Sequence, residues 1–275
     1  MVTFGLERAG LVDGGQLQVR EAAREAVSSG FPSLDALLPA GGLRRGSLIE
    51  WLAGGAEAAG GAAGTGAASL AAAVACRLAG AAPGRPGTIV VVDRTGWFHP
   101  PAVLPWLGAG ADAARLIVAR PAHDADEIWT IDQALRCAGV AAVLAWPWAV
   151  VAAGGCLAAT RRRAAQPWTI AMRRWQLAAR ASGAVGLFVR PESARGEPSW
   201  AEARIAVSPV PDGTLLDRRL RLARVGGAWA GAAEGDLRTV EVVLDLARGC
   251  AAAARPAAGA VPSRGFARGA SCRAS

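Results

Sequence analysis

Short apolar runs alternate with segments of helical periodicity along most of the chain, and this alternation constrains the fold more than any other feature. The runs at 88–93 and 140–146 read TIVVVD and VAAVLAW, without the polar alternation of a half-exposed strand. Between them, Ile128, Ile131 and Leu135 recur at helix spacing. Strands buried on both faces and separated by helices are typical of a parallel α/β sheet.

The same pattern assigns the remaining elements. Strands are expected at 47–51, 88–93, 115–119, 140–146 and 184–190, and helices at 21–27, up to 78, at 100–107, 124–138 and 168–182. Strand-like segments at 203–207, 220–225 and 238–244 follow without helices between them, which suits an antiparallel extension at one sheet edge. The predicted fold class is α/β, a mostly parallel sheet flanked by helices with a C-terminal antiparallel extension. We expect a lead-in at 1–30, one domain at 31–246 and a disordered Arg/Ala-rich tail at 247–275.

Charge is spread unevenly over the 275 residues. The net charge is +8, and because the chain has no lysine, all 30 basic residues are arginines. Chemistry that needs a lysine, such as a Schiff base or the phosphate clamp of a P-loop, is therefore excluded. The tail carries arginines and no acid, so it is either a polyanion-binding segment or simply a solvated one.

Cysteine and histidine are too few and too scattered for a metal site. The five cysteines include no CxxC pair, and the two histidines are His99 and His123, so neither structural zinc nor a disulfide framework is expected. No secretory signal follows Met1, which predicts a cytoplasmic protein. The uncharged run 137–160 is long enough to span a bilayer, but Pro147 interrupts it and favours a strand leading into a loop and helix.

A glycine-rich frame follows the first strand. Residues 61–68 read GAAGTGAA, which places Gly61 and Gly66 as in a P-loop but puts Ala67 and Ala68 where Lys and Ser/Thr are required. Ser69 is the nearest hydroxyl. This degenerate P-loop is either a structural turn or a residual phosphate cradle made of backbone amides.

Several spaced motifs in order resemble the RecA recombinase over about residues 30–245. They are SLDALLPAGGLRRGSLIEWLAG at 33–54, VVVDRTGWFHPPAVLPWLG at 90–108 and EIWTIDQALRCAGVAAVLAWP at 127–147. The resemblance implies a RecA-like core. It also puts the P-loop lysine on Ala67, the magnesium-binding hydroxyl on Ala68, the water-activating glutamate on Thr95 and the Walker B aspartate on Trp146. Only Asp93 keeps its acid, so the resemblance implies a fold without the ATPase activity, with no cofactor expected and ATP binding doubtful.

Among RecA-like proteins, the chain resembles the ImuA proteins, accessory proteins of damage-induced mutagenesis. The segment RRWQLAARASGAVGLFVRP at 173–191 resembles a stretch common in that family, and ARIAVSP and RRLRLARVGG follow it. The resemblance implies a non-catalytic adaptor in SOS-type translesion synthesis. Its implied partners are the polymerase-like protein ImuB, a DnaE-type error-prone polymerase and RecA, with DNA contact possible and no membrane.

Arginines between the Walker B-like strand and the next strand are the candidate DNA or partner contacts. They are Arg161, Arg162, Arg163, Arg173 and Arg174, and Trp148, Trp168 or Trp175 could stack on bases. The alternative is a solvated arginine face with tryptophans in the core, since Trp168, Met172 and Trp175 follow core spacing. Glu127 and Asp132 are expected on the solvent side of their helix, and Asp93 as a cap or ion-pair acceptor.

Two other functions stay open on the sequence. A SulA-type cell-division inhibitor would share a RecA-related fold without a P-loop. A residual nucleotide-binding or DNA-binding module would use the glycine frame, or the tail together with Arg161–Arg163.

Overall fold

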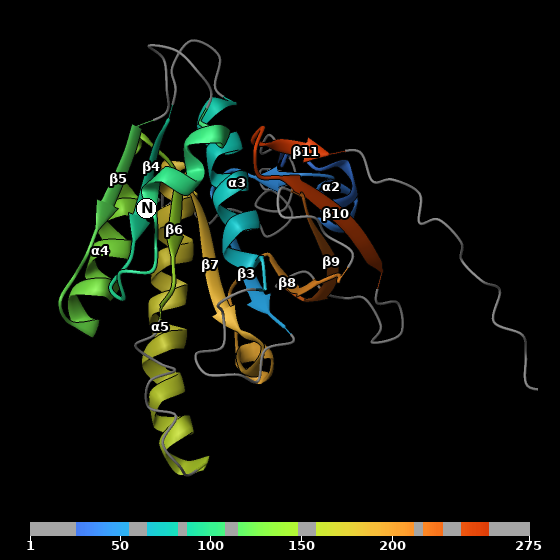
Figure 1. Ribbon diagram of the computed structural model, residues 1–275. Helices are drawn as coiled ribbons and strands as arrows, with labels where there is room; N and C mark the ends of the chain where they lie inside the picture. The colour runs from blue at the N-terminus through green and yellow to red at the C-terminus, as the bar shows by residue number, and fades with distance from the viewer. Residues whose placement is uncertain are drawn as a thin grey trace, which may run out of the picture.

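The computed structural model describes residues 26–54, 65–81, 87–107, 115–147, 158–211, 217–227 and 238–252, and for 158–167 and 251–252 only the backbone. Nine strands form one sheet in the order β11-β10-β9-β8-β3-β7-β6-β4-β5 (Figure 1). Its strands are β3 Leu48–Ala53, β4 Thr88–Val92, β5 Arg115–Ala119, β6 Val140–Ala145, β7 Val185–Pro191, β8 Ala203–Pro209, β9 Asp217–Gly226, β10 Thr239–Asp245 and β11 Cys250–Ala252. A separate two-stranded sheet pairs β1 Ala26–Val27 with β2 Leu43–Arg44.

The sheet is parallel from β8 to β5 and antiparallel from β9 to β11. The predicted fold class is therefore confirmed, with one correction. The segment 203–207 was expected in the antiparallel extension, but β8 lies parallel to β3 and antiparallel only to β9. The eleven-residue connection 192–202 after β7, which contains the short 3-10 helix η2 Glu192–Gly196, carries the chain across β3 and allows this parallel pairing.

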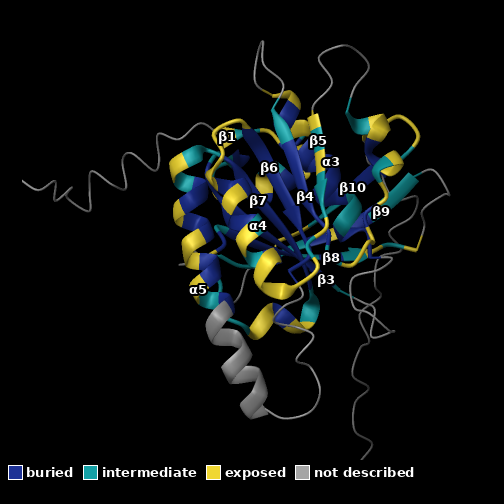
Figure 2. Ribbon diagram, turned by 90° about the vertical axis from the view of Figure 1, so that its left-hand side faces the viewer, coloured by how far each residue is buried: buried dark blue, intermediate teal, exposed yellow. Residues whose placement is uncertain are grey.

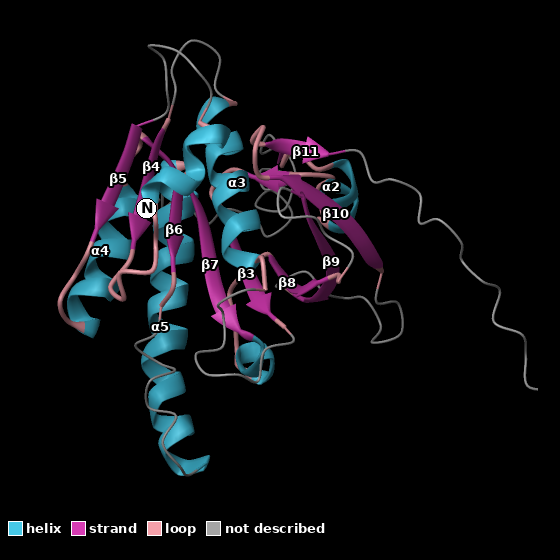
Figure 3. Cartoon of the chain, viewed as in Figure 1, coloured by secondary structure: helices cyan, strands magenta, loops and turns pink. Residues whose placement is uncertain are grey.

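Helices cover both faces of the sheet (Figure 3). On one face lie α2 Pro32–Leu37, α3 Ala67–Gly80 and the 3-10 helix η1 Pro100–Trp106, packed on a core that contains Trp51, Leu70 and Val91. On the other lie α4 Asp124–Arg136 and α5 Ala158–Ser182 over a second core. The central strands β7, β6 and β4 are buried, while the outward sides of α4 and α5 are exposed (Figure 2). Strands covered on both sides explain the unbroken apolar runs in the sequence.

Both ends of the described chain differ from expectation. Ala26 and Val27 form strand β1 where a helix was predicted, and the remainder of the predicted helix lies outside the described residues. Beyond Leu246, where no order was expected, the chain turns and pairs β11 with β10. Asp245 closes that turn by accepting hydrogen bonds from the amides of Ala247 and Arg248 at 3.0 and 2.8 Å.

Candidate functional site

Asp93 follows β4 at the carboxyl edge of the sheet, where parallel α/β proteins hold ligands. Its side chain is fully buried and its oxygens are occupied by the loop that follows. Oδ1 accepts from the Trp97 amide at 3.0 Å and the Thr95 hydroxyl at 3.1 Å, and Oδ2 accepts from the Phe98 amide at 2.9 Å. Arg120 adds a longer ion-pair contact at 3.8 Å. Asp93 therefore shapes its own loop; of the two roles expected for it, the ion pair with Arg120 is present, whereas the residue before the next helix, η1, is His99 and not Asp93.

An aromatic pair lies beside Asp93 at the same edge. Trp146 comes directly after β6 and is 5% exposed, and its ring lies 6.2 Å from that of Phe98 between centroids, at a tilt of 45°. Both rings belong to the core under α3. The position that the RecA resemblance assigns to a magnesium-binding aspartate thus holds a buried indole, which supplies no oxygen ligand.

The degenerate P-loop ends in the first turn of α3. Gly66 is the N-cap residue with φ of 86°, and the Thr65 hydroxyl accepts a 3.3 Å hydrogen bond from the Ala67 amide. A β-carbon on Gly66 would lie 2.4 Å from Leu220 of β9, so this turn packs directly against the antiparallel extension. Ala67 is buried, Ala68 and Ser69 are half-buried, and Gly61 lies outside the described residues. The first turn of α3 is therefore already in contact with the chain's own groups, the Thr65 hydroxyl and the Leu220 side chain.

A buried ion network joins three strands on the face of the sheet that α4 and α5 cover. This network was not expected from the sequence. Glu50 of β3 accepts from Arg190 of β7 at 3.2 Å and from Arg204 of β8 at 2.6 Å, and all three side chains are buried. Arg190 also pairs with Glu197 and lies 4.1 Å from the ring centroid of Trp168. The sequence did contain a signal for this network, namely a single charged residue inside each of three apolar strands. Because an unpaired charge is almost never buried, each such residue should have a partner of opposite charge.

Glu127 and Asp132 of α4 are buried, which corrects the expectation that they face solvent. Glu127 pairs with Arg94 at 3.2 Å, and its Oε1 atom has no hydrogen-bond partner. Burial raises the pKa of Glu127 from 4.5 to about 7, although the nearby Arg94 acts in the opposite direction. Asp132 accepts ion pairs from Arg136 of its own helix and from Arg174 of α5. The expectation failed because α4 packs against the sheet and against α5, so more than one side of it is covered.

The candidate arginines fall in α5. Arg173 hydrogen-bonds to Gln176 and lies 4.5 Å from the ring centroid of Trp200, and Arg174 pairs with Asp132 at 3.3 Å. Both stay exposed, so the outer parts of their guanidinium groups face solvent. Arg161, Arg162 and Arg163 lie in the first half of α5, where only the backbone is described, and Trp148 lies outside the described residues. Trp168, Met172 and Trp175 are buried, as their spacing predicted.

Exposed apolar side chains accompany these arginines on the outward sides of α4 and α5. Ile170 and Leu177 lie two turns apart on α5 and are 61% and 50% exposed. Trp129 on α4 is 62% exposed. The Trp175 indole donates to the Ile128 carbonyl, and the Ser182 hydroxyl donates to the Leu135 carbonyl, so the two helices run parallel with Trp129 near the level of Leu177. We call Trp129, Ile170, Leu177, Arg173 and Arg174 the outer helix surface.

Other features of the described residues carry no catalytic arrangement. Arg44 pairs with Glu202 at 3.6 Å, and His99 is exposed at the start of η1 without a capping hydrogen bond from its side chain. Within the described ranges, no three His, Cys, Asp or Glu side chains gather as a metal site, and no helix is long and apolar enough to cross a membrane.

Comparison with known proteins decides the family. The chain is 31% identical over 202 residues to Protein ImuA from two strains of Caulobacter vibrioides, a match that covers 70% of this chain and 71% of each relative. This chain belongs to the ImuA family. No protein-family model matches it. Membership of the ImuA family indicates a role in damage-induced mutagenesis, and the relation to RecA stays an inference from the sequence motifs.

Proposed function

We propose that this ImuA-family protein is a non-catalytic cytoplasmic adaptor in SOS-type translesion synthesis, bridging a polymerase-like partner to RecA or DNA. The observation that carries the proposal is the occupied carboxyl edge of the sheet. There, the Trp146–Phe98 pair fills the space beside β6, and the loop after β4 saturates Asp93.

Phosphoryl transfer needs a lysine and acids at defined positions of this edge, and the charged side chains described there, such as Asp93 and Arg94, pair with the chain's own groups. On the RecA resemblance, the lysine, magnesium-binding hydroxyl, water-activating glutamate and Walker B aspartate fall on Ala67, Ala68, Thr95 and Trp146, none of which is ionised at neutral pH. Each such group contributes about 3 kcal/mol or more of transition-state stabilisation. A scaffold that lacks all four does not hydrolyse ATP at an enzymatic rate.

The outer helix surface supplies what an adaptor needs. Exposed Trp129, Ile170 and Leu177 offer an apolar centre, and Arg173 and Arg174 give the rim a positive charge. Aromatic and arginine side chains are enriched where proteins bind one another. The partners that fit the proposal are ImuB, a DnaE-type polymerase and RecA.

A deletion strain of the host tests the proposal. Loss of the gene should lower the ultraviolet-induced mutation frequency, and the wild-type gene should restore it. The purified protein should release no phosphate from ATP above a blank. Restored mutagenesis together with robust hydrolysis would contradict the non-catalytic role, and unchanged mutagenesis in the deletion strain would contradict the mutagenic role.

Three further assays separate the alternatives. Filamentation on overexpression would favour the division inhibitor over the adaptor. Tight ATP retention in equilibrium dialysis would favour a nucleotide binder. Salt-dependent DNA retention that disappears when residues 246–275 are removed would favour a DNA-binding module.

A further inference from the structure

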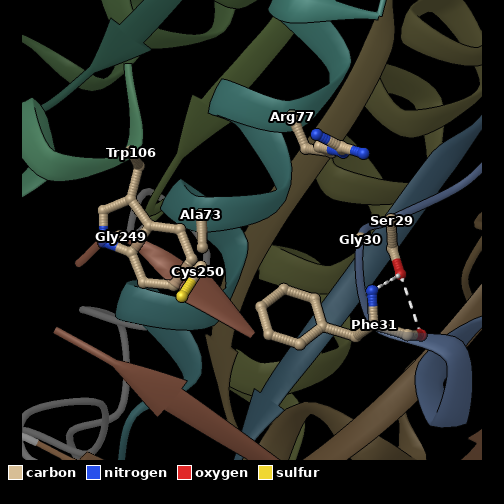
Figure 4. Close-up of a pocket in the computed structure, with 8 residues that line it drawn as sticks. All are labelled: Ser29, Gly30, Phe31, Ala73, Arg77, Trp106, Gly249 and Cys250. Atoms are coloured by element: carbon tan, nitrogen blue, oxygen red, sulfur yellow. Dashed lines mark hydrogen bonds between the residues drawn. The ribbon is translucent and has the colours of Figure 1, made fainter. Parts of the chain in front are cut away.

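A pocket of about 290 Å³ opens between α3, η1, the residues before α2 and the turn into β11. It is lined by Ser29, Gly30, Phe31, Ala73, Arg77, Trp106, Gly249 and Cys250 (Figure 4). Arg77 lies in the last turn of α3, whereas the degenerate P-loop lies at the first turn of the same helix. The pocket is therefore separate from the edge of the sheet discussed above.

Two aromatic rings form the apolar part of the pocket. The rings of Phe31 and Trp106 lie 6.3 Å apart between centroids, tilted by 40°. Phe31 is nearly fully buried, while Trp106 keeps part of its ring exposed. The Ser29 hydroxyl fixes this wall, because it accepts from the Phe31 amide and donates to the Phe31 carbonyl. A partly exposed indole beside a fixed phenyl ring favours a further aromatic side chain as a ligand.

Arg77 supplies the charge. Its guanidinium is exposed and makes no ion pair or hydrogen bond with the described residues, and it lies on a different side of the pocket from Trp106 (Figure 4). Ala73, one turn earlier on α3, has a side chain too small to fill the space between them. A free guanidinium pairs with a carboxylate through two parallel hydrogen bonds.

Size and charge select the occupant. Pockets for small-molecule ligands start at roughly 300 Å³, so this one accommodates about one large side chain. The chain beyond Ala252 contains four arginines and no acid, namely Arg255, Arg264, Arg268 and Arg273. This segment is positively charged like Arg77 and is therefore repelled by it. We propose that the pocket binds an acidic peptide segment of a partner protein, with an aromatic side chain against Trp106 and a neighbouring carboxylate on Arg77.

Cys250 makes the proposal measurable, because its exposed thiol lines the pocket. Cys137 is also exposed, but it follows α4 on the other face of the sheet and serves as an internal control. Burial raises the pKa of Cys76 to about 12, so that thiol reacts slowly. Peptide mapping by mass spectrometry after timed iodoacetamide treatment of the full chain gives the alkylation rate of each cysteine.

The probe is the peptide Ac-Asp-Glu-Phe-Asp-amide. At twice its dissociation constant it should slow Cys250 alkylation about three-fold by mass action and leave the Cys137 rate unchanged. Ac-Asn-Gln-Phe-Asn-amide and Ac-Asp-Glu-Ala-Asp-amide, which lack the charges or the ring, should protect much less. Equal protection by either control peptide, or no protection at saturating concentration, would overturn the proposal.

Two variants of Arg77 test the charge. Arg77→Ala should lose protection by the acidic peptide, while Arg77→Glu should instead be protected by Ac-Lys-Arg-Phe-Lys-amide. Arg115→Ala removes an exposed arginine from the opposite edge strand, β5, and should behave like wild type. Protection that survives Arg77→Ala would show that the carboxylate has another partner and would overturn the assignment. These assays need only the purified protein, so their outcome does not depend on the adaptor role.

Discussion

Single buried residues at the carboxyl edge of the sheet are held by packing and by hydrogen bonds from the chain itself. Trp146 has no carboxylate to offer a metal ion, but its indole fills the space between β6 and Phe98. The buried carboxylate of Asp93 is bound by the chain's own donors. At this scale, Trp146 contributes packing and Asp93 shapes the loop that follows β4.

Trp146→Ala should accordingly lower the free energy of unfolding by about 3–5 kcal/mol, because it removes a large buried ring. Urea denaturation followed by circular dichroism measures the change. Trp97→Ala, at a half-exposed indole in the same region, is the matched control and should cost much less. A small effect at Trp146 would mean that its ring does not support the core.

Glu127 should make stability depend on pH. Its carboxyl has a pKa of about 7 in the folded protein against 4.5 ordinarily, so the folded state holds its proton more tightly than the unfolded state. Stability from this group is therefore present at low pH and falls between about pH 4.5 and 7, by on the order of 3 kcal/mol. Glu127→Gln should remove most of this fall.

Urea titrations at pH 5 and pH 8 check this expectation. Relative to wild type, Glu127→Gln should be more favourable at pH 8 than at pH 5. Glu241→Gln, which alters a surface ion pair with Arg221, serves as the control and should show no such trend. An identical pH dependence in wild type and Glu127→Gln would contradict the raised pKa.

At the scale of elements, the Glu50 network fixes the junction between β7, β3 and β8. One carboxylate there is shared by two buried guanidinium groups from different strands, and Arg190 has a second carboxylate partner in Glu197. Arg204 also donates to the carbonyls of Ala194, Arg195 and Glu197, which ties η2 and the residue after it to the same junction. The network thus holds the crossover that makes β8 parallel.

Glu50→Gln should destabilise the protein by about 3–5 kcal/mol, because it leaves two buried positive charges without their shared partner. The thermal unfolding midpoint and the urea midpoint should both fall. The Glu241→Gln change should cost at most about 1 kcal/mol in the same assays. Equal costs for the two changes would show that the buried network adds no stability.

The positions of the helices and strands are easier to predict from the sequence than the way in which the strands pair. The β5 run RLIVA was predicted with its observed bounds, because an apolar strand between turn residues is a local signal. The direction of β8 depends on its partner β3, about 150 residues earlier, which no local pattern encodes. The short β11 exists because β10 offers an edge, and the tight turn between Asp245 and Gly249 was its only local sign.

The candidate site likewise has features that the sequence predicts locally and features that depend on contacts between distant segments. On the RecA resemblance, the absence of the lysine and acids from the P-loop and Walker B positions can be predicted residue by residue. The Trp146–Phe98 contact, the burial of Glu127 and the pocket at Arg77 arise from packing between distant segments. Only the lone charges at Glu50, Arg190 and Arg204 left a trace in the sequence.

On the scale of the whole molecule, the sheet carries helices on both of its faces. The Trp146–Phe98 pair packs at the carboxyl edge beside β6, and α4 and α5 present exposed apolar and basic side chains on their outward sides. Ile170→Glu and Leu177→Glu should change stability by no more than about 0.5 kcal/mol, because both side chains already face solvent. The double variant should nevertheless fail to restore damage-induced mutagenesis in a deletion strain. Full restoration would show that partners bind elsewhere.

The adaptor role itself is tested most directly by capturing the tagged protein from its own host after DNA damage and identifying its partners by mass spectrometry. We expect the wild-type chain to recover a polymerase-like protein, a DnaE-type polymerase or RecA, and the Ile170→Glu/Leu177→Glu variant to lose them. Recovery of the tubulin-like division protein instead, or of no repair factor, would contradict the adaptor role.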